Sequence, residues 1–162
     1  MIVAVISDTH LPRGARRIPA ACLERLRGAD LILHAGDVTA ASFLDELAAL
    51  GPPVHAVHGN VDDAALRGRL PETLVVDAGG LRIGMTHDAG PRTGREERLV
   101  RRFPGCDAVV YGHTHEPQVA CVGEIWILNP GSPTERRRAP SHTMLVLEVA
   151  AGAIRPELIP LS

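Results

Sequence analysis

The first half of the chain alternates short apolar runs with amphipathic segments. Residues 2–7 (IVAVIS) form a continuous apolar run with the length of a buried strand. The same pattern predicts helices over residues 19–27 and 41–50 and strands over residues 31–35 and 53–58. Strand–helix–strand alternation at this spacing predicts parallel strands joined by right-handed crossovers.

The second half is dominated by β-prone runs and therefore indicates a different arrangement. Two of these runs flank Gly79-Gly80, a pair typical of a tight hairpin, and a charged helix is predicted over residues 94–103. We expect a mixed sheet or two facing sheets with helices outside, in a single domain over residues 1–162, with 130–141 as the longest loop. The predicted strands cover residues 73–78, 81–86, 107–111, 118–122, 124–128, 143–149 and 153–160.

Composition and charge exclude several classes of protein. A chain of 162 residues with 45% hydrophobic and 22% charged residues is globular, and a net charge of −2 argues against a dedicated nucleic-acid or membrane-surface binder. No apolar run reaches the roughly 18 residues of a membrane span, and the N-terminus reads as a strand rather than a signal peptide. Three distant cysteines favour neither a disulfide framework nor a thiolate zinc site, so we expect a cytoplasmic location.

The composition also makes a few polar residues stand out. All 17 basic residues are arginine, and asparagine occurs only as Asn60 and Asn129, a pattern typical of GC-rich coding. Eight histidines are many for such a chain. Only four aromatic residues are present, which leaves little stacking surface for nucleic-acid bases and disfavours a processive nuclease.

Five predicted strands carry potential metal ligands at their C-terminal ends, which is the edge where open α/β sheets bind ligands. A single strand-end His is more often structural and a strand-end Asp is more often a helix N-cap, but five such ends together favour a site. Imidazole and carboxylate ligands suit Mn, Fe, Ni, Co or Zn, and two ions sharing a bridging carboxylate would use all the candidates. The candidates are Asp8, His10, Asp37, Asn60, His87, His113 and His115.

The order of these motifs resembles the calcineurin-like metallophosphoesterase superfamily. The motifs are D-x-H at residues 8–10, GD at 36–37, GN at 59–60, a mid-chain His87 and GHTH at 112–115. The GNVDD segment and the later NPGSP segment (129–133) resemble the small YfcE-like phosphodiesterase branch. The resemblance implies a four-layer α/β/β/α sandwich of two mixed sheets flanked by helices.

The resemblance also implies a role for each matching residue. Asp8, His10 and His115 would hold a first metal ion, while Asn60, His87 and His113 would hold a second, with Asp37 bridging the two. Phosphorus would be attacked by a metal-bridging hydroxide, so catalysis is placed at Asp37, Asn60 and His113. We expect two divalent transition-metal ions, with Mn ahead of Ni, Fe, Co and Zn.

Three positions depart from the family pattern. Many members have a GNH motif, whose His helps to protonate the leaving group or to stabilise the transition state. This chain has Val61 at that position, and valine cannot transfer a proton. Asp88 stands where Gly is usual, and His58 stands where a longer basic residue is frequent. The Val61 departure leaves the metal ligands intact but favours esters with acidic leaving groups.

Several residues near the motifs have two interpretations each. Asp62 is either the carboxylate partner of a metal-bound imidazole or the N-cap of a helix over 63–68. Asn129 and Ser132 either orient or contact a ligand or simply form a tight turn. Arg136 and its two neighbours form a solvated loop, unless that loop returns to the metal edge and one of them binds substrate phosphate. The remaining histidines, His34, His55 and His142, are expected to be structural.

The sequence thus predicts a dinuclear-metal-dependent phosphodiesterase acting on a small phosphoester, without a stable nucleic-acid or membrane partner. A homo-oligomer is compatible with the sequence. One alternative is a phosphomonoesterase or pyrophosphatase on the same metals. The other is a non-catalytic scaffold resembling the retromer subunit with this fold, although that subunit has lost metal ligands and all seven matching positions are intact here.

Overall fold

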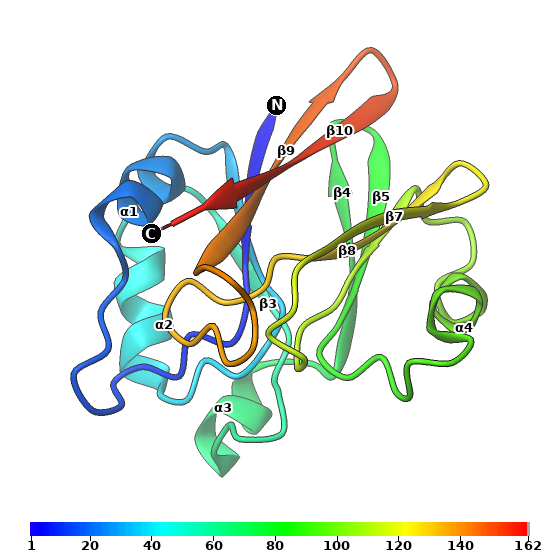
Figure 1. Ribbon diagram of the computed structural model, residues 1–162. Helices are drawn as coiled ribbons and strands as arrows, with labels where there is room; N and C mark the ends of the chain where they lie inside the picture. Colours follow the sequence, from blue (N-terminus) through cyan, green and yellow to red (C-terminus); the bar gives the residue numbers. More distant parts are fainter. Residues whose placement is uncertain (162) are drawn as a thin grey trace.

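The computed structural model describes residues 1–161 and has four layers, with two five-stranded mixed sheets facing each other between helices (Figure 1). This confirms the predicted α/β/β/α sandwich and decides for two facing sheets. In chain order the elements are β1 (Ile2–Ile6), α1 (Ala20–Arg27), β2 (Leu31–His34), α2 (Ala41–Ala48), β3 (Val54–Ala56), α3 (Ala64–Arg69), β4 (Thr73–Ala78), β5 (Leu81–Thr86), α4 (Arg95–Arg102), β6 (Ala108–Val110), β7 (Gln118–Val122), β8 (Ile125–Asn129), β9 (Thr143–Ala150) and β10 (Ala153–Pro160).

Both sheets combine parallel and antiparallel strands, with antiparallel pairs on one side of the first sheet and on both sides of the second. The first sheet has the order β10-β9-β1-β2-β3, in which β1, β2 and β3 are parallel, as the strand–helix alternation predicts. The second sheet has the order β4-β5-β6-β8-β7, in which β5, β6 and β8 are parallel. The β4–β5 hairpin turns at Gly79 and Gly80, whose φ angles of 60° and 84° suit the tight turn expected there.

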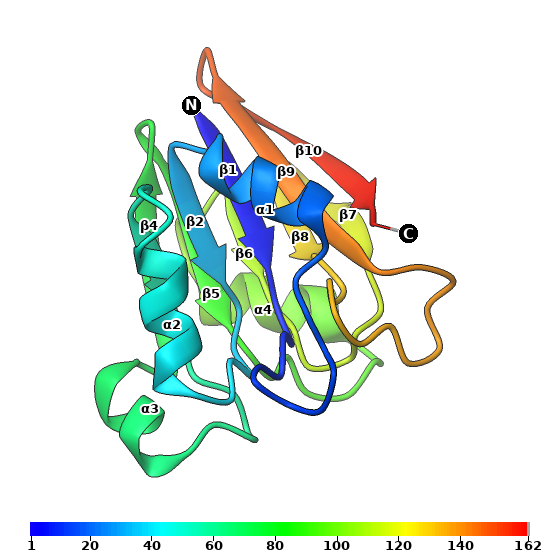
Figure 2. The ribbon, with the colours of Figure 1, turned by 90° about the vertical axis from the view of Figure 1, so that its left-hand side faces the viewer.

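Alternation along the central strands explains why the layers pack in this order. Val3 and Val5 of β1 belong to the apolar cluster between the two sheets. Ala4 and Ile6, on the opposite face of the same strand, belong to a second cluster with α1 and α2 (Figure 2). A third cluster joins Leu99 of α4 to the outer face of the second sheet. A strand that is apolar on both faces is therefore covered on both faces.

Several predicted elements are one to three residues shorter than expected, among them the strand before the GN motif and the second helix. The predicted strand 53–58 pairs only over Val54–Ala56, because the following residues leave the sheet toward the edge that carries the polar motifs. The predicted helix 41–50 ends at Ala48, followed by a turn in which the Leu50 N–H donates to Leu47. Within residues 1–161, no helix combines the length and apolarity needed to cross a membrane.

Candidate metal centre

The seven predicted ligands come together at one edge of the sandwich. They lie directly after the C-terminal ends of β1, β3, β5 and β6 and in the loop that follows β2. These strands end at the same side of the molecule, which is the lower side in Figure 2. Because the two sheets face each other, loops from both can reach one point, and the site lies where they meet.

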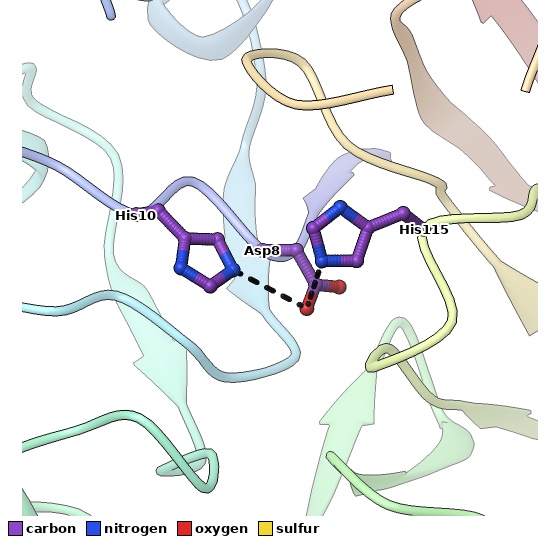
Figure 3. Close-up of side chains that lie close together, drawn as sticks. All are labelled: Asp8, His10 and His115. Atoms are coloured by element: carbon purple, nitrogen blue, oxygen red, sulfur yellow. Dashed lines mark ion pairs between the residues drawn. The ribbon is translucent and has the colours of Figure 1, made fainter. Parts of the chain in front are cut away.

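Asp8, His10 and His115 form the first group of potential ligand atoms. One nitrogen or oxygen from each residue lies within 4.8 Å of the others, and all three residues are buried. The Asp8 Oδ1 atom is 3.3 Å from His115 Nε2 and 4.0 Å from His10 Nε2. Figure 3 shows the two imidazole rings approaching the Asp8 carboxylate from either side.

The second group lies beside the first and is joined to it by carboxylates. Asp8, Asp37 and His87 form a second cluster with ligand atoms within 4.8 Å of one another. The Asn60 Oδ1 atom is 3.1 Å from His87 Nε2 and 3.0 Å from His113 Nδ1. Asp37 Oδ2 lies 3.2 Å from His87 Nε2 and 3.6 Å from His10 Nε2, so one oxygen reaches both groups.

Unpartnered buried atoms test whether this site suits a metal ion. Within residues 1–161, Asp8 Oδ1, both ring nitrogens of His10 and His115 Nε2 are buried without a hydrogen-bond partner. Buried polar atoms without partners destabilise a fold, so they are rare unless another group satisfies them. Nitrogen and carboxylate donors of this kind suit borderline first-row metals. The residues therefore fit the divalent ions that the sequence predicts.

Two of the histidines are oriented by backbone carbonyls. His87 Nδ1 lies 2.7 Å from the carbonyl oxygen of Ala35, and His115 Nδ1 lies 2.6 Å from that of Glu135. If Nδ1 carries the proton and donates it to the carbonyl, the Nε2 lone pair faces the centre. Metal-binding histidines are typically held in this way, with the second ring nitrogen donating to a carbonyl or carboxylate.

The electrostatics keep the carboxylates charged and one imidazole neutral. Burial raises the pKa of Asp8, but the nearby imidazoles of His115 and His87, together with the hydrogen bond from the Ser7 hydroxyl, outweigh burial, and the net pKa falls below its ordinary value. Burial lowers the pKa of His10 in spite of the nearby carboxylates Asp37, Asp8 and Glu135. A neutral imidazole next to ionised carboxylates is the protonation state that metal binding requires.

The backbone of the site is held in an uncommon conformation. Five of the seven predicted ligands have positive φ, a region that non-glycine residues seldom occupy, although Asp and His enter it more readily than most. Such residues cost on the order of 1–3 kcal/mol each and cluster at functional sites. The residues and their φ angles are Asp8 (55°), His10 (48°), Asp37 (57°), His113 (70°) and His115 (61°).

Three glycines bring the ligand loops close together. A Cβ atom at Gly36 would lie 2.7 Å from Nδ1 of His87. A Cβ at Gly59 would overlap the Asp37 carboxylate, and one at Gly112 would overlap the Ser7 hydroxyl. The missing side chain of Gly112 thus admits the side chains of Ser7 and Asp8.

Asp62 is not the N-cap of α3, and its carboxylate contacts backbone N–H groups rather than an imidazole. Its carboxylate accepts hydrogen bonds from the backbone N–H groups of Asp37, Thr39 and Gly59, at 3.2, 2.6 and 2.7 Å. The N-cap of α3 is Asp63, whose side chain accepts from the Leu66 N–H. Asp62 thus joins two ligand loops through their backbones, because the chain reverses after Asn60 and turns its carboxylate back toward the end of β2.

Asn129 and Ser132 position the site rather than facing a substrate. Both are buried. The Asn129 amide donates to the carbonyl of Gly112 and to the Thr114 hydroxyl, and its Oδ1 accepts from the Gly131 N–H. The Ser132 hydroxyl donates to the carbonyl of Asp8. The NPGS turn therefore orients the two metal-ligand motifs at Asp8 and at residues 112–115.

The loop over residues 130–141 does return to the metal edge, but Arg136 is not the arginine that points there. Its guanidinium donates to the carbonyls of Ala139 and Pro140 in its own loop. The adjacent Arg137 donates to the carbonyl of His113 at 3.5 Å. Arg136 therefore closes its own loop through Nη1, and the contact of an arginine of this loop with substrate phosphate stays a prediction.

The three departures from the family pattern have separate environments. Val61 donates its N–H to Asp37 Oδ1 and leaves its side chain exposed. His58 lines a cavity of about 290 Å³ together with Asn60 and His87. Asp88 lines the same cavity, and its carboxylate accepts from the Gly90 N–H in a local turn. His58 therefore lies beside the second ligand group, a position that the sequence did not indicate.

His34 and Glu135 have structural neighbours that the sequence did not indicate. His34 is fully buried beneath the ligand loops, where its ring pairs with the Thr9 hydroxyl and accepts from the Gly36 N–H, in agreement with the structural role expected for it. Glu135 lies with one carboxylate oxygen 3.8 Å from His10 Nε2. No sequence signal distinguished Glu135, because a Glu before three arginines is typical of a solvated loop.

Comparison with known proteins places the chain in a family. A family model described as the calcineurin-like phosphoesterase superfamily domain matches residues 1–152. The chain belongs to this superfamily. Membership confirms the resemblance seen in the motifs and indicates a metal-dependent phosphoester hydrolase, with the Asp and His clusters as the groups that could hold the metal.

Two curated relatives and one solved structure illustrate this kinship. A probable metallophosphoesterase of Methanothermobacter thermautotrophicus is 36% identical over 161 residues, covering 98% of this chain and 92% of the relative. A probable metallophosphoesterase of Methanocaldococcus jannaschii is 37% identical over 164 residues, covering 99% and 82%. Wild-type Vps29 from Entamoeba histolytica, solved in complex with Zn²⁺, has a TM-score of 0.77 and 29% identity over 100% of both chains.

Proposed function

We propose that this superfamily member is a dinuclear metal-dependent phosphodiesterase that acts on a small phosphodiester. The observation that carries the proposal is the position of Asp37, one of whose oxygens lies within 3.6 Å of His10 in the first ligand group and 3.2 Å of His87 in the second. A carboxylate in this position serves two ions at once. The buried, unpartnered atoms of Asp8, His10 and His115 further support binding of an ion by the first ligand group.

Each ligand group has a defined part in this proposal. Asp8, His10 and His115 would hold one ion, Asn60, His87 and His113 would hold the other, and Asp37 would bridge them. Divalent ions supply a hydroxide nucleophile at neutral pH and Lewis-acid stabilisation of charged phosphoryl oxygens. The Val61 N–H fixes the second oxygen of Asp37, and Asp62 holds the backbone of the same loop, so the bridging carboxylate is oriented from both sides.

The absence of a side-chain acid at Val61 shapes the substrate preference. Where the family often has a histidine, this chain has an exposed valine, which has no proton to give to a departing alkoxide. We therefore expect faster turnover of aryl phosphodiesters with acidic leaving groups than of alkyl esters. A plot of log kcat/KM against leaving-group pKa should have a clearly negative slope, and a flat plot would contradict the expectation.

The experiment that tests the proposal combines metal analysis with a phosphoester panel. Purified protein is loaded separately with Mn²⁺, Ni²⁺, Co²⁺ or Zn²⁺, the last because the similar Vps29 was solved with Zn²⁺. Turnover of paired aryl mono- and diesters and of pyrophosphate is then measured for wild type, Asp37→Asn and His113→Ala. We expect diester hydrolysis that falls about 100-fold or more in both variants. His55→Ala, a change at an exposed histidine of β3, is the matched control.

The other outcomes separate the alternatives. A preference for monoesters or pyrophosphate would favour the phosphomonoesterase or pyrophosphatase alternative. Wild-type activity in both variants would overturn the two-ion assignment. If no phosphoester is hydrolysed with any of the four metals, the scaffold alternative would replace the enzymatic one.

A further inference from the structure

Glu135 lies in the loop between β8 and β9, and this loop is fastened to the first ligand group. The Ser132 hydroxyl donates to the carbonyl of Asp8 and accepts the N–H of Glu135 at 2.9 Å. The Thr134 hydroxyl donates to the carbonyl of Thr9 at 2.6 Å. Glu135 is therefore held against the Asp8–His10 segment by hydrogen bonds on the residues just before it.

Both ends of Glu135 are directed toward ligands of the first ion. Its backbone carbonyl is the group that orients His115 through Nδ1. Its side-chain Oε2 lies 3.8 Å from Nε2 of His10, one of the two unpartnered nitrogens of that ring and the one near the carboxylates of Asp8 and Asp37. The residue thus reaches the first ligand group from the main chain and from the side chain.

The distance between Glu135 and His10 suits two ligands of one ion better than a hydrogen bond. A separation of 3.8 Å is too long for a hydrogen bond. Ligand atoms that each lie about 2.1 Å from a metal are separated by at most about 4.2 Å. His10 Nε2 lies 4.0 Å from Asp8 Oδ1, 3.6 Å from Asp37 Oδ2 and 3.8 Å from Glu135 Oε2, so each of these oxygens could share an ion with His10. Glu135 is not among the residues whose ligand atoms lie within 4.8 Å of one another around Asp8, so its side chain would have to rotate inward to share an ion with Asp8 and His115 as well.

The second oxygen of Glu135 is occupied by Arg16. The guanidinium of Arg16 lies 3.0 Å from Oε1, and both side chains are 28% exposed. An ion pair with this exposure contributes little to stability by itself. It does hold the carboxylate in one orientation, with Oε2 toward His10 and Oε1 toward the arginine.

We propose that Glu135 is a further carboxylate ligand of the first metal ion, toward which its side chain would rotate away from the ion pair with Arg16. The inference rests on the proposed function, since it presumes that the Asp8, His10 and His115 group binds an ion. It adds to that group a residue outside the motifs through which the chain resembles its superfamily. The chemical consequence is tighter binding of the first ion and a more negative first coordination sphere.

Calorimetric titration of metal-free protein with Mn²⁺ tests this directly, without reference to activity. Glu135→Gln keeps the size of the side chain and its backbone carbonyl but replaces the charged oxygen. We expect the affinity for the first ion to fall about 10- to 100-fold, with the second ion little affected. Glu135→Asp keeps the charge, but its side chain is one methylene shorter, so this variant should also bind the first ion less tightly.

Two control variants separate ligation from general electrostatics. Glu116→Gln removes one exposed negative charge next to His115 and should leave the Mn²⁺ affinity near that of wild type. Arg16→Gln removes the competing cation while leaving the carboxylate, and should keep or raise the affinity. The visible absorption of the Co²⁺-loaded protein should change in Glu135→Gln and remain unchanged in Glu116→Gln, because it reports the ligand set.

The outcomes also separate this inference from the proposed function. Wild-type affinity and an unchanged Co²⁺ spectrum in Glu135→Gln would overturn the inference, as would an equal loss of affinity in Arg16→Gln or Glu116→Gln. Two bound ions in wild type with no hydrolysis of any phosphoester would overturn the proposed function and leave the Glu135 assignment standing. A wild-type protein that binds no ion would overturn both.

Discussion

At the scale of single residues, His34 shows how the site depends on a group that does not face it. The Gly36 N–H donates to His34 Nδ1, so that nitrogen carries no proton and Nε2 must donate to the Thr9 hydroxyl. The ring is therefore neutral and links the loop after β1 to the loop after β2. Burial lowers the pKa of His34 to about 4.

This lowered pKa predicts a loss of stability in mild acid. The unfolded state binds a proton near pH 6.5 and the folded state only near 4, so the stabilisation is complete above pH 6.5 and decreases as pH falls toward 4. Between pH 7.5 and 5 the contribution amounts to about 2 kcal/mol. We expect urea unfolding with a chelator present to show that wild type loses about this much more stability than His34→Gln over that range. Parallel pH profiles for the two proteins would contradict the prediction.

Gly59 offers a second prediction at the residue scale. Its α-carbon lies so close to the Asp37 carboxylate that any added Cβ would overlap it. Gly59→Ala should therefore displace the bridging carboxylate and weaken Mn²⁺ binding by about tenfold or more. Gly68 in α3 has open space around its α-carbon, so Gly68→Ala should keep the Mn²⁺ affinity and gain about 0.5–1 kcal/mol of stability. Calorimetric titration measures the affinities. A Mn²⁺ affinity in Gly59→Ala equal to that of wild type would contradict the proposed displacement of the Asp37 carboxylate.

At the scale of elements, the loop between β3 and α3 contains two adjacent aspartates with different tasks. Asp63 caps α3 through one hydrogen bond to the Leu66 N–H, a local role that a helix N-terminus commonly requires. Asp62 accepts three backbone N–H groups from two separate loops and is buried. One aspartate therefore ends a helix, and the other connects the loops that carry Asp37 and Asn60.

The pair predicts unequal effects of the same substitution. Asp63→Ala should cost about 1 kcal/mol, the usual value for a lost N-cap. Asp62→Ala leaves three backbone donors without their acceptor and should cost about 2 kcal/mol or more. It should also weaken metal binding, which Asp63→Ala should not. Chemical denaturation and Mn²⁺ titration of both variants check this. Equal losses of stability and of Mn²⁺ affinity in the two variants would contradict the role of Asp62 in connecting the two loops.

At the scale of the whole molecule, the metal edge joins the two sheets. Ligands from the first sheet (Asp8, His10, Asp37, Asn60) face ligands from the second (His87, His113, His115), and the parallel strands of both sheets end there. The apolar cluster between the sheets holds the rest of the interface. Ions bound at this edge would therefore connect the two halves of the sandwich as well as the individual loops.

Metal removal should consequently lower the stability of the whole fold. An ion present at 100 times its dissociation constant stabilises the folded state by about 2.7 kcal/mol. For a chain of this size that corresponds to a Tm shift of about 5–10 °C. We expect scanning calorimetry to show such a decrease when Mn²⁺ is replaced by EDTA, and a much smaller one in Asp37→Asn. A Tm that does not respond to EDTA would contradict the prediction.

The sequence by itself determined the main elements and the set of candidate ligands. Strand-length apolar runs and the Gly79-Gly80 turn depend on interactions between near neighbours, so the hairpin and the strand–helix alternation could be predicted. The convergence of the seven candidate ligands could be predicted because each follows a strand and because the order of their motifs is typical of a family. These features are encoded locally along the chain.

Tertiary structure alone decided the residues that support the ligands. In the sequence Asp62 is a turn aspartate and Glu135 a charged loop residue, and nothing local shows which backbone or imidazole each one contacts. Their contacts join segments as far apart as residues 10 and 135, and only the packing of two sheets brings those segments together. Because a side chain's role at such a distance depends on which loops approach, it follows from the fold and not from the spacing of residues.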